Sequence, residues 1–295
     1  MFFFRLLSRL PLPVLYALSY LLYVLSYYVI GYRKKVVAAN LNLAFPRKTA
    51  AEKKAIARQF YRNLADILVE TLKLLTISSG ELGRRVTIAN PEVLLEHLDR
   101  GQSIVVMTGH QGNWEWLLQG CALHLGYDVD AVYKPLRNKF SEKFMLAIRR
   151  RFGPLPVPMK HLPRALVQRR PVVRIIAMVA DQAPAPEMAH WLDFFGRDTP
   201  FFAGAAKIAQ RTAYPVLYTG MKRLRRGYYQ VHMAPIALPP YPPDAAETII
   251  GRYAAAVQAA IEERPSEWLW SHKRWKHKRR PETGGRDTAF GGDAA

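Results

Sequence analysis

The chain has 295 residues, of which 43 are Lys or Arg and 23 are Asp or Glu, so its formal net charge is +20. Its length suits one large domain or two small ones, and its apolar fraction of 50% excludes wholesale disorder. A single cysteine excludes an internal disulfide framework and any cysteine-rich zinc cluster. The positive charge predicts an anionic partner, which composition leaves open as nucleic acid, an anionic membrane, a phosphorylated substrate or an acidic protein.

An uncharged segment near the N-terminus, Leu10 to Tyr32, is long enough to cross a bilayer. Basic residues flank both of its ends, so its orientation is not determined. Four tyrosines within it, spaced by three or four residues, would form one stripe on a helix. They are Tyr16, Tyr20, Tyr23 and Tyr27. We predict that residues 1–35 are a membrane anchor that either spans the bilayer or lies at its interface, with its tyrosines facing the rest of the protein. The alternatives are a secretory signal and a buried helix of a soluble domain.

Strand and helix patterns alternate along the remaining chain, after a long amphipathic helix that begins at the capping box of Thr49 and Glu52 and ends near Leu75. The predicted strands cover residues 86–89, 103–108, 129–134, 172–180, 216–219 and 228–233. The predicted helices cover residues 91–98, 114–125, 141–152, 162–169, 205–212 and 245–263. This alternation predicts an α/β fold over residues 36–280, with a mostly parallel central sheet and helices on both faces. Residues 281–295 are predicted to be a disordered tail.

The turn after the predicted strand 103–108 carries the most informative chemistry. It presents His110 at the carboxyl end of a buried strand, where ligands collect in open α/β sheets. We expect the carboxylate of Glu115, in the first turn of the following helix, to reach the imidazole and form a general-base pair. The helix N-terminus at Asn113 offers N–H groups for a developing oxyanion. Because no Ser, Cys or Thr nucleophile is spaced recognisably, direct attack by a substrate hydroxyl is the simpler mechanism.

Five sequence blocks occur in order around and after this turn. They are His110-Gln-Gly-Asn-Trp-Glu115, Tyr133-Lys-Pro-Leu-Arg-Asn138, Arg150-Arg-Phe-Gly153, Asp181-Gln182 followed by Phe194-Phe-Gly196, and Trp268-Leu-Trp-Ser-His-Lys-Arg-Trp-Lys276. Together they resemble the late acyltransferases of lipid A biosynthesis, in the glycerolipid acyltransferase superfamily, over about residues 10–277. Lys134 stands where that family often has Arg, which removes bidentate phosphate geometry there.

The resemblance implies a bacterial inner-membrane enzyme with its active site on the cytoplasmic side. It implies transfer of a fatty acyl chain from an acyl carrier protein thioester to a hydroxyl-bearing acyl chain of a phosphorylated lipid A precursor. His110 would be the general base and Glu115 would orient it, with no cofactor and no metal. The substrate-binding residues would be Asn113, Lys134, Arg137, Asn138, Arg150, Asp181 and Gln182. The alternative is the same fold acting on another acceptor, such as a lysophospholipid, a glycolipid or an aryl-polyene-type product.

The positive charge gathers in two stretches of the chain. Residues 133–174 hold twelve Lys or Arg against one acid, and residues 271–280 hold six with no acid. We expect the first stretch to meet acceptor phosphates and an acidic carrier protein. The second interleaves cations with Trp268, Trp270 and Trp275, a pattern expected at the headgroups of an anionic leaflet. A non-catalytic binder of nucleic acid would leave the His110 turn unexplained, so we expect a membrane partner and no nucleic acid.

Overall fold

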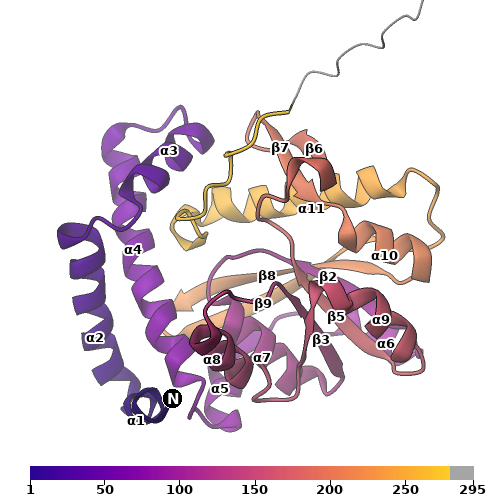
Figure 1. Cartoon of the computed structure of the whole chain (residues 1–295), viewed down its shortest axis with the longest axis horizontal. Coiled ribbons are helices and arrows are strands. Elements are labelled where there is room, and N and C mark those ends of the chain that lie inside the picture. The colour runs from indigo at the N-terminus through magenta and orange to yellow at the C-terminus, as the bar shows by residue number, and fades with distance from the viewer. Residues whose placement is uncertain (280–295) are drawn as a thin grey trace, which may run out of the picture.

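The computed structural model describes residues 1–279 and contains a seven-stranded sheet with helices on both faces (Figure 1). In spatial order the strands are β1 (Val86–Ile88), β9 (Tyr228–Ala237), β8 (Val216–Arg225), β2 (Ile104–Thr108), β5 (Arg174–Val179), β3 (Asp128–Tyr133) and β4 (Leu155–Pro158). All neighbouring strands pair in parallel except β8 and β9, which are antiparallel. The predicted α/β fold with a mostly parallel sheet is confirmed.

Two helical layers cover the sheet, and the central strand β2 contributes to both. The covering helices are α5 (Ser79–Arg85), α6 (Glu92–Leu98), α7 (Trp114–Leu125), α8 (Lys139–Arg149), α9 (Leu162–Gln168), α10 (Gly204–Thr212) and α11 (Ala245–Glu263). Val105 and Met107 of β2 pack in the core that α10 and α11 complete, whereas Ile104 and Val106 pack in the core with α6 and α7. Because successive side chains of a strand point to opposite faces, β2 is buried on both sides. Its burial holds the turn that follows it in a fixed position at the edge of the sheet.

The first four helices form a separate layer beside the sheet (Figure 1). They are α1 (Phe2–Ser8), α2 (Leu12–Val24), α3 (Lys34–Ala44) and α4 (Ala50–Lys73). The predicted capping box is present, since Thr49 and Glu52 bond each other's backbone N–H at the start of α4. Helix α4 packs against α2 on one side and α7 on the other, so it joins the N-terminal layer to the sheet domain.

The predicted N-terminal apolar segment is α2, continued by a π-helical turn over Leu25–Val29. Leu12–Val29 is long and apolar enough to cross a membrane. The expectation that all four tyrosines face the protein is wrong for Tyr20, which is 61% exposed. The buried face of α2 is centred on Leu12, Ser19 and Tyr23, which leaves Tyr20 just outside the contact with α4.

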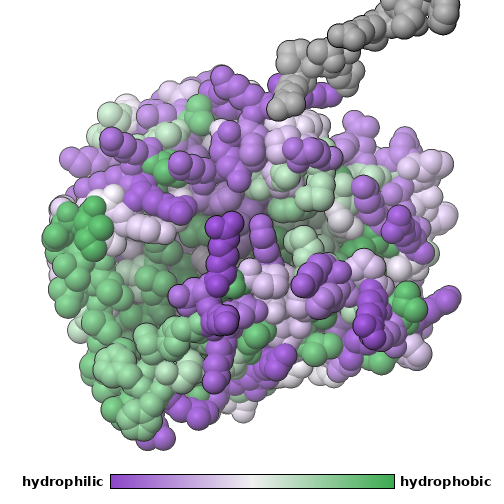
Figure 2. All heavy atoms as spheres, viewed as in Figure 1, coloured by the Kyte–Doolittle hydropathy of each residue, from purple (hydrophilic) through white to green (hydrophobic). Residues whose placement is uncertain are grey.

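The opposite face of this layer is apolar and exposed. Its large exposed side chains include Phe2, Phe3, Leu6, Val14, Leu21, Val29 and Ile30. Figure 2 shows a continuous hydrophobic area on the side of the molecule formed by α1 and α2. An apolar surface of this kind marks a site of interaction with a membrane or another protein.

Several elements differ from the predictions. Strand β8 continues past its predicted end to Arg225, because charged residues such as Lys222 and Arg223 mask the strand pattern. Strand β9 continues to Ala237 through Pro235, a residue type that usually ends a strand. Strand β4 and the small hairpin of β6 (Ala189–Asp193) with β7 (Asp198–Phe202) were not predicted, and neither were α1, α3 and α5. The predicted disordered tail, residues 281–295, lies outside the described residues.

Candidate active site

The turn that carries His110 connects β2 to α7, as the sequence predicted. Asn113 caps α7, because its Oδ1 accepts a hydrogen bond from the Trp116 N–H at 3.0 Å. Gly112 has a φ of +60°, and a Cβ there would lie 3.2 Å from the side chain of Met221, so both conformation and space favour glycine. The C-terminal segment holds the turn, since Leu269 N–H donates to the His110 carbonyl and Gly112 N–H donates to the Glu267 carbonyl, each at 3.0 Å.

The carboxylate that contacts His110 belongs to Asp181. Asp181 Oδ1 lies 2.6 Å from His110 Nδ1, and its Oδ2 accepts hydrogen bonds from the His110 backbone N–H and the Trp268 indole N–H, each at 2.7 Å. Asp181 is only 1% exposed. Burial raises the pKa of Asp181, but the charge and hydrogen bonds of His110 and the bond from Trp268 outweigh burial and lower this pKa to about 2. Asp181 is therefore an ionised acceptor that orients the imidazole.

The strand register explains this pairing. Strands β2 and β5 are parallel neighbours, and Thr108 lies opposite Val179 at their carboxyl ends. His110 and Asp181 each follow two residues later, so they leave the same edge of the sheet side by side. Sequence reasoning assigned Asp181 to substrate binding, because the chain passes through β3 and β4 between the two strands and hides their adjacency.

The other ring nitrogen of His110 is available to accept a proton. With Nδ1–H donated to Asp181, Nε2 carries a lone pair, and it lies 3.3 Å from the Gln182 side-chain nitrogen. The His110 side chain is 18% exposed, and its ring meets Trp114 edge-on at a centroid distance of 5.1 Å. The predicted residue Gln182 therefore lies beside the proposed basic nitrogen.

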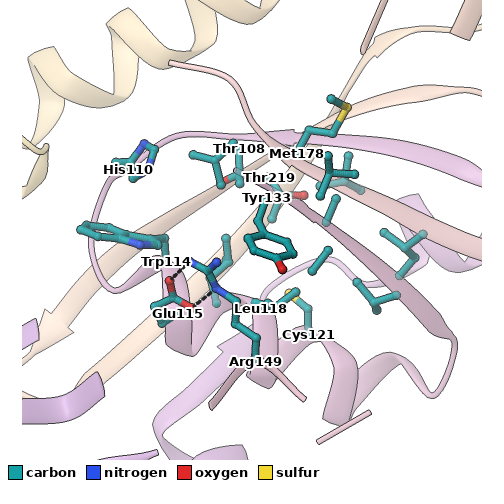
Figure 3. A pocket seen from close by; sticks show the side chains of 18 of the residues that line it. Thr108, His110, Trp114, Glu115, Leu118, Cys121, Tyr133, Arg149, Met178 and Thr219 are labelled. Carbon is teal, nitrogen blue, oxygen red and sulfur yellow. Dashed lines mark hydrogen bonds and ion pairs between the residues drawn. The ribbon is translucent and has the colours of Figure 1, made fainter. Parts of the chain in front are cut away.

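The expectation that Glu115 orients His110 is wrong in this geometry. Glu115 instead forms a two-point ion pair with Arg149, with Oε2 at 3.0 Å from Nε and Oε1 at 2.6 Å from Nη2 (Figure 3). The first turn of α7 directs this side chain toward α8, while Asp181 already occupies His110 Nδ1. Sequence reasoning missed Arg149 as a partner, although it lies four residues after Met145, which packs against the core, and so points inward on α8.

A cavity of about 530 Å³ opens beside His110 between the sheet and α7. Polar lining residues include Glu115, Tyr133, Lys134, Arg137, Arg149 and Gln182. Apolar lining residues include Val106, Leu117, Leu118, Leu125, Val129 and Ile175, together with Cys121. Figure 3 shows His110 and Trp114 on one side of this cavity and Cys121 farther along α7. The volume and mostly apolar lining are those of a site for a small or chain-like ligand.

The remaining predicted binding residues divide into two groups. Lys134 and Arg137 are exposed and line the cavity. Asn113 is fully buried, with one end bonded to Trp116 and the other to Glu70, so here it caps α7 and does not line the cavity; its contact with substrate stays a prediction. Asn138 caps α8 through Ser141, and Arg150 is exposed on the surface rather than lining the cavity. The structure therefore brings together Lys134, Arg137 and Gln182 with the His110 pair.

Several cations of the stretch 133–174 serve the fold. Arg174 is fully buried and bonds Asp130 at 2.8 Å. Arg151 donates to the carbonyls of Leu75 and Ile77, which ties the end of α8 to the end of α4. The exposed remainder includes Lys134, Arg137, Lys139, Lys143 and Arg150. This remainder, rather than the whole stretch, presents positive charge to a partner.

Trp268 and Trp270 lie inside the protein and Trp275 is partly buried against Phe194 and Phe195, which corrects their expected place among membrane headgroups. Trp268 is 2% exposed and bonds Asp181, and Trp270 is fully buried. Arg274 is also buried, with its guanidinium carbon 4.3 Å from the ring centroid of Phe201. This segment packs beside the carboxyl ends of β2 and β5 and supports the His110 turn. Within residues 1–279, no cluster of three His, Cys, Asp or Glu side chains is arranged to hold a metal ion.

A family model matches almost the whole chain. The family model described as "Bacterial lipid A biosynthesis acyltransferase" matches residues 1–277, which include the His110 turn, Asp181 and the C-terminal tryptophans. Among curated proteins, none matches the sequence.

Proposed function

Because the chain belongs to the bacterial lipid A biosynthesis acyltransferase family, whose members are acyltransferases, we propose its donor, acceptor and mechanism. It transfers a fatty acyl chain from an acyl carrier protein thioester to the hydroxyl of an acyl chain on a phosphorylated lipid A precursor. The observation that carries this proposal is the His110–Asp181 pair beside an apolar cavity.

In the proposed reaction His110 Nε2 removes the proton from the acceptor hydroxyl as its oxygen attacks the thioester carbonyl carbon. Asp181 stabilises the imidazolium that forms through its 2.6 Å contact with Nδ1. The tetrahedral intermediate collapses, the C–S bond breaks, and the departing thiolate takes the proton from Nε2. The products are the new ester and the free thiol of the carrier, and His110 returns to its starting state.

The cavity holds the donor's acyl chain in this proposal. Its apolar lining along α7 and the sheet takes the hydrocarbon out of water, which is worth about 0.8 kcal/mol for each buried methylene. The ion pair of Glu115 with Arg149 fixes α7 against α8 and so keeps the cavity wall in place. Glu115 thus acts on the shape of the binding site rather than on the base.

Exposed cations beside the cavity receive the anionic parts of both substrates. Lys134 and Arg137 line the cavity, and Lys139 and Lys143 continue the basic surface along α8. Acceptor phosphates and an acidic carrier protein are matched to such a surface. Their binding is therefore expected to weaken as salt is raised.

The exposed apolar face of α1 and α2 supports binding to the bacterial inner membrane, with the active site on the cytoplasmic side. Basic residues lie at both ends of this face, at Arg5 and Arg9 and again at Arg33, Lys34 and Lys35. One side of α2 packs on α4, so the exposed side remains for lipid. An apolar face bordered by cations suits an anionic bilayer.

Acyl transfer by purified variants tests the proposal. With acylated carrier protein and a lipid A precursor, His110→Ala is expected to lower kcat by at least about 10²-fold, because general-base catalysis contributes about 10²–10⁴-fold. His190→Ala, a histidine on β6 outside the cavity lining, is the control and should keep normal turnover. Near-normal turnover in a folded His110→Ala variant would overturn the mechanism.

A further inference from the structure

Glu70 is a buried acidic residue that the proposed acyl transfer does not use. It lies in the second half of α4 and is 0% exposed. Its Oε2 accepts hydrogen bonds from the Asn113 side-chain amide at 2.8 Å and the Tyr229 hydroxyl at 2.7 Å. Its Oε1 accepts a hydrogen bond from the Tyr16 hydroxyl at 2.8 Å. Three donors from three different elements therefore meet at one carboxylate.

One of these donors belongs to the catalytic turn. Asn113 lies three residues after His110, and its Oδ1 is already occupied by the Trp116 N–H, so its amide nitrogen must face Glu70. The Trp116 indole N–H donates to the Glu70 backbone carbonyl at 2.8 Å. Helix α4 therefore holds the start of α7 at two points, both of them at Glu70.

Another donor belongs to the layer that carries the exposed apolar face. Tyr16 lies on α2, and its hydroxyl reaches Glu70 only while α2 is packed against α4. A Cβ added to Gly227, in the turn between β8 and β9, would lie 2.2 Å from this hydroxyl, so the tyrosine is held against that turn. The carboxylate of Glu70 therefore links the hydroxyl of Tyr16 directly to Asn113, the N-cap residue of α7.

We propose that Glu70 is a positioning residue that couples the packing of α2 on α4 to the geometry of the His110 turn. The proposal rests on the proposed function for its catalytic readout. When α2 is in place, Tyr16 completes the set of donors and Glu70 holds Asn113 at the start of α7. When the Tyr16 hydroxyl is missing, Oε1 loses its donor, and the carboxylate turns away from its best alignment with Asn113.

The test removes the Tyr16 hydroxyl and keeps its ring. In Tyr16→Phe, kcat for acyl transfer is expected to fall about tenfold with KM values within about twofold, as suits loss of a hydrogen bond to a buried carboxyl group outside the substrate site. Hydrogen exchange of the backbone N–H groups over residues 110–117 should become faster. The matched control is Tyr127→Phe, which removes a tyrosine hydroxyl from the carboxylate of Asp99 at the surface and should change neither quantity.

A conservative variant separates positioning from general stability. In Glu70→Gln the amide oxygen can accept from Asn113 and Tyr229, and the amide nitrogen can donate to the Tyr16 oxygen, so kcat is expected within about threefold of normal. Unchanged kcat and unchanged exchange in Tyr16→Phe would overturn the proposal. A different pair of results would separate the two proposals. If the unaltered protein showed no acyl transfer but Tyr16→Phe still exchanged faster over residues 110–117, the coupling would stand and the proposed function would fall.

Discussion

Asp181→Asn is a sharp perturbation because the two oxygens of Asp181 have different partners. Oδ2 accepts two N–H groups, from the His110 backbone and from Trp268, and Oδ1 faces His110 Nδ1. In the variant the amide oxygen must remain with the two N–H groups, so the amide nitrogen takes the place of Oδ1. It then donates to Nδ1 and moves the imidazole proton to Nε2, which can no longer act as a base.

The expected size of the effect follows from this tautomer. Holding a catalytic histidine in the wrong tautomer lowers kcat by about 10⁴-fold in a related carboxylate–histidine arrangement, so we expect a loss of about 10³- to 10⁴-fold here, on the order of 4–5.5 kcal/mol. KM should change little, because Asp181 is buried and away from substrate. Single-turnover acyl transfer from a labelled carrier protein measures the loss.

Glu115→Gln is the matched variant, because it also converts a carboxylate near His110 to an amide. The introduced amide oxygen would keep one hydrogen bond from Arg149, and the His110 pair would be untouched. The kcat of this variant should fall by no more than about tenfold, the scale of a weakened charged hydrogen bond. A larger loss in Glu115→Gln than in Asp181→Asn would refute the assignment of the orienting carboxylate.

Two further predictions follow from the same residues. Cys121→Phe fills part of the cavity along α7, so transfer of the longest accepted acyl chains should fall at least tenfold relative to shorter chains, since each excluded methylene loses about 0.8 kcal/mol of binding. Competition between carrier proteins loaded with long and short acyl chains measures this ratio. An unchanged ratio, or an equal shift in Cys121→Ala, would contradict the prediction. The depressed pKa of Asp181, about 2 against 3.8, contributes about 2 kcal/mol of stability that is present above pH 4 and is lost as pH falls toward 2. The free energy of unfolding, measured with urea, should therefore fall less between pH 4 and pH 2 in Asp181→Asn than in the unaltered protein. An equal fall in the two proteins would rule out this contribution.

The sequence pattern predicts the local parts of the site well, because local physics determines them. A five-residue buried strand followed by a turn and an N-cap residue places His110 in the turn before α7, and the structure has that arrangement. The capping box at Thr49 and the full length of α11 were likewise predicted from the sequence and are confirmed. These features depend only on neighbours within a few residues.

The partners of those local features depend on strand order, which a single sequence does not reveal. Asp181 meets His110 because β5 inserts beside β2, although β3 and β4 come between them along the chain. The spacing of Glu115 from His110 suggested a contact, but the direction of α7 sends that side chain to Arg149. Trp268 and Trp270 likewise resembled membrane-interface residues by composition, and tertiary packing buries them.

The lipid A mass spectrum of a bacterial strain that lacks this protein, compared with the same strain carrying it, tests the central claim most directly. Lipid A from the deficient strain is expected to lack one acyl chain, and the intact protein is expected to restore it. His110→Ala and Asp181→Asn are expected not to restore it. An unchanged acyl count in the deficient strain, or full restoration by either variant, would contradict the account.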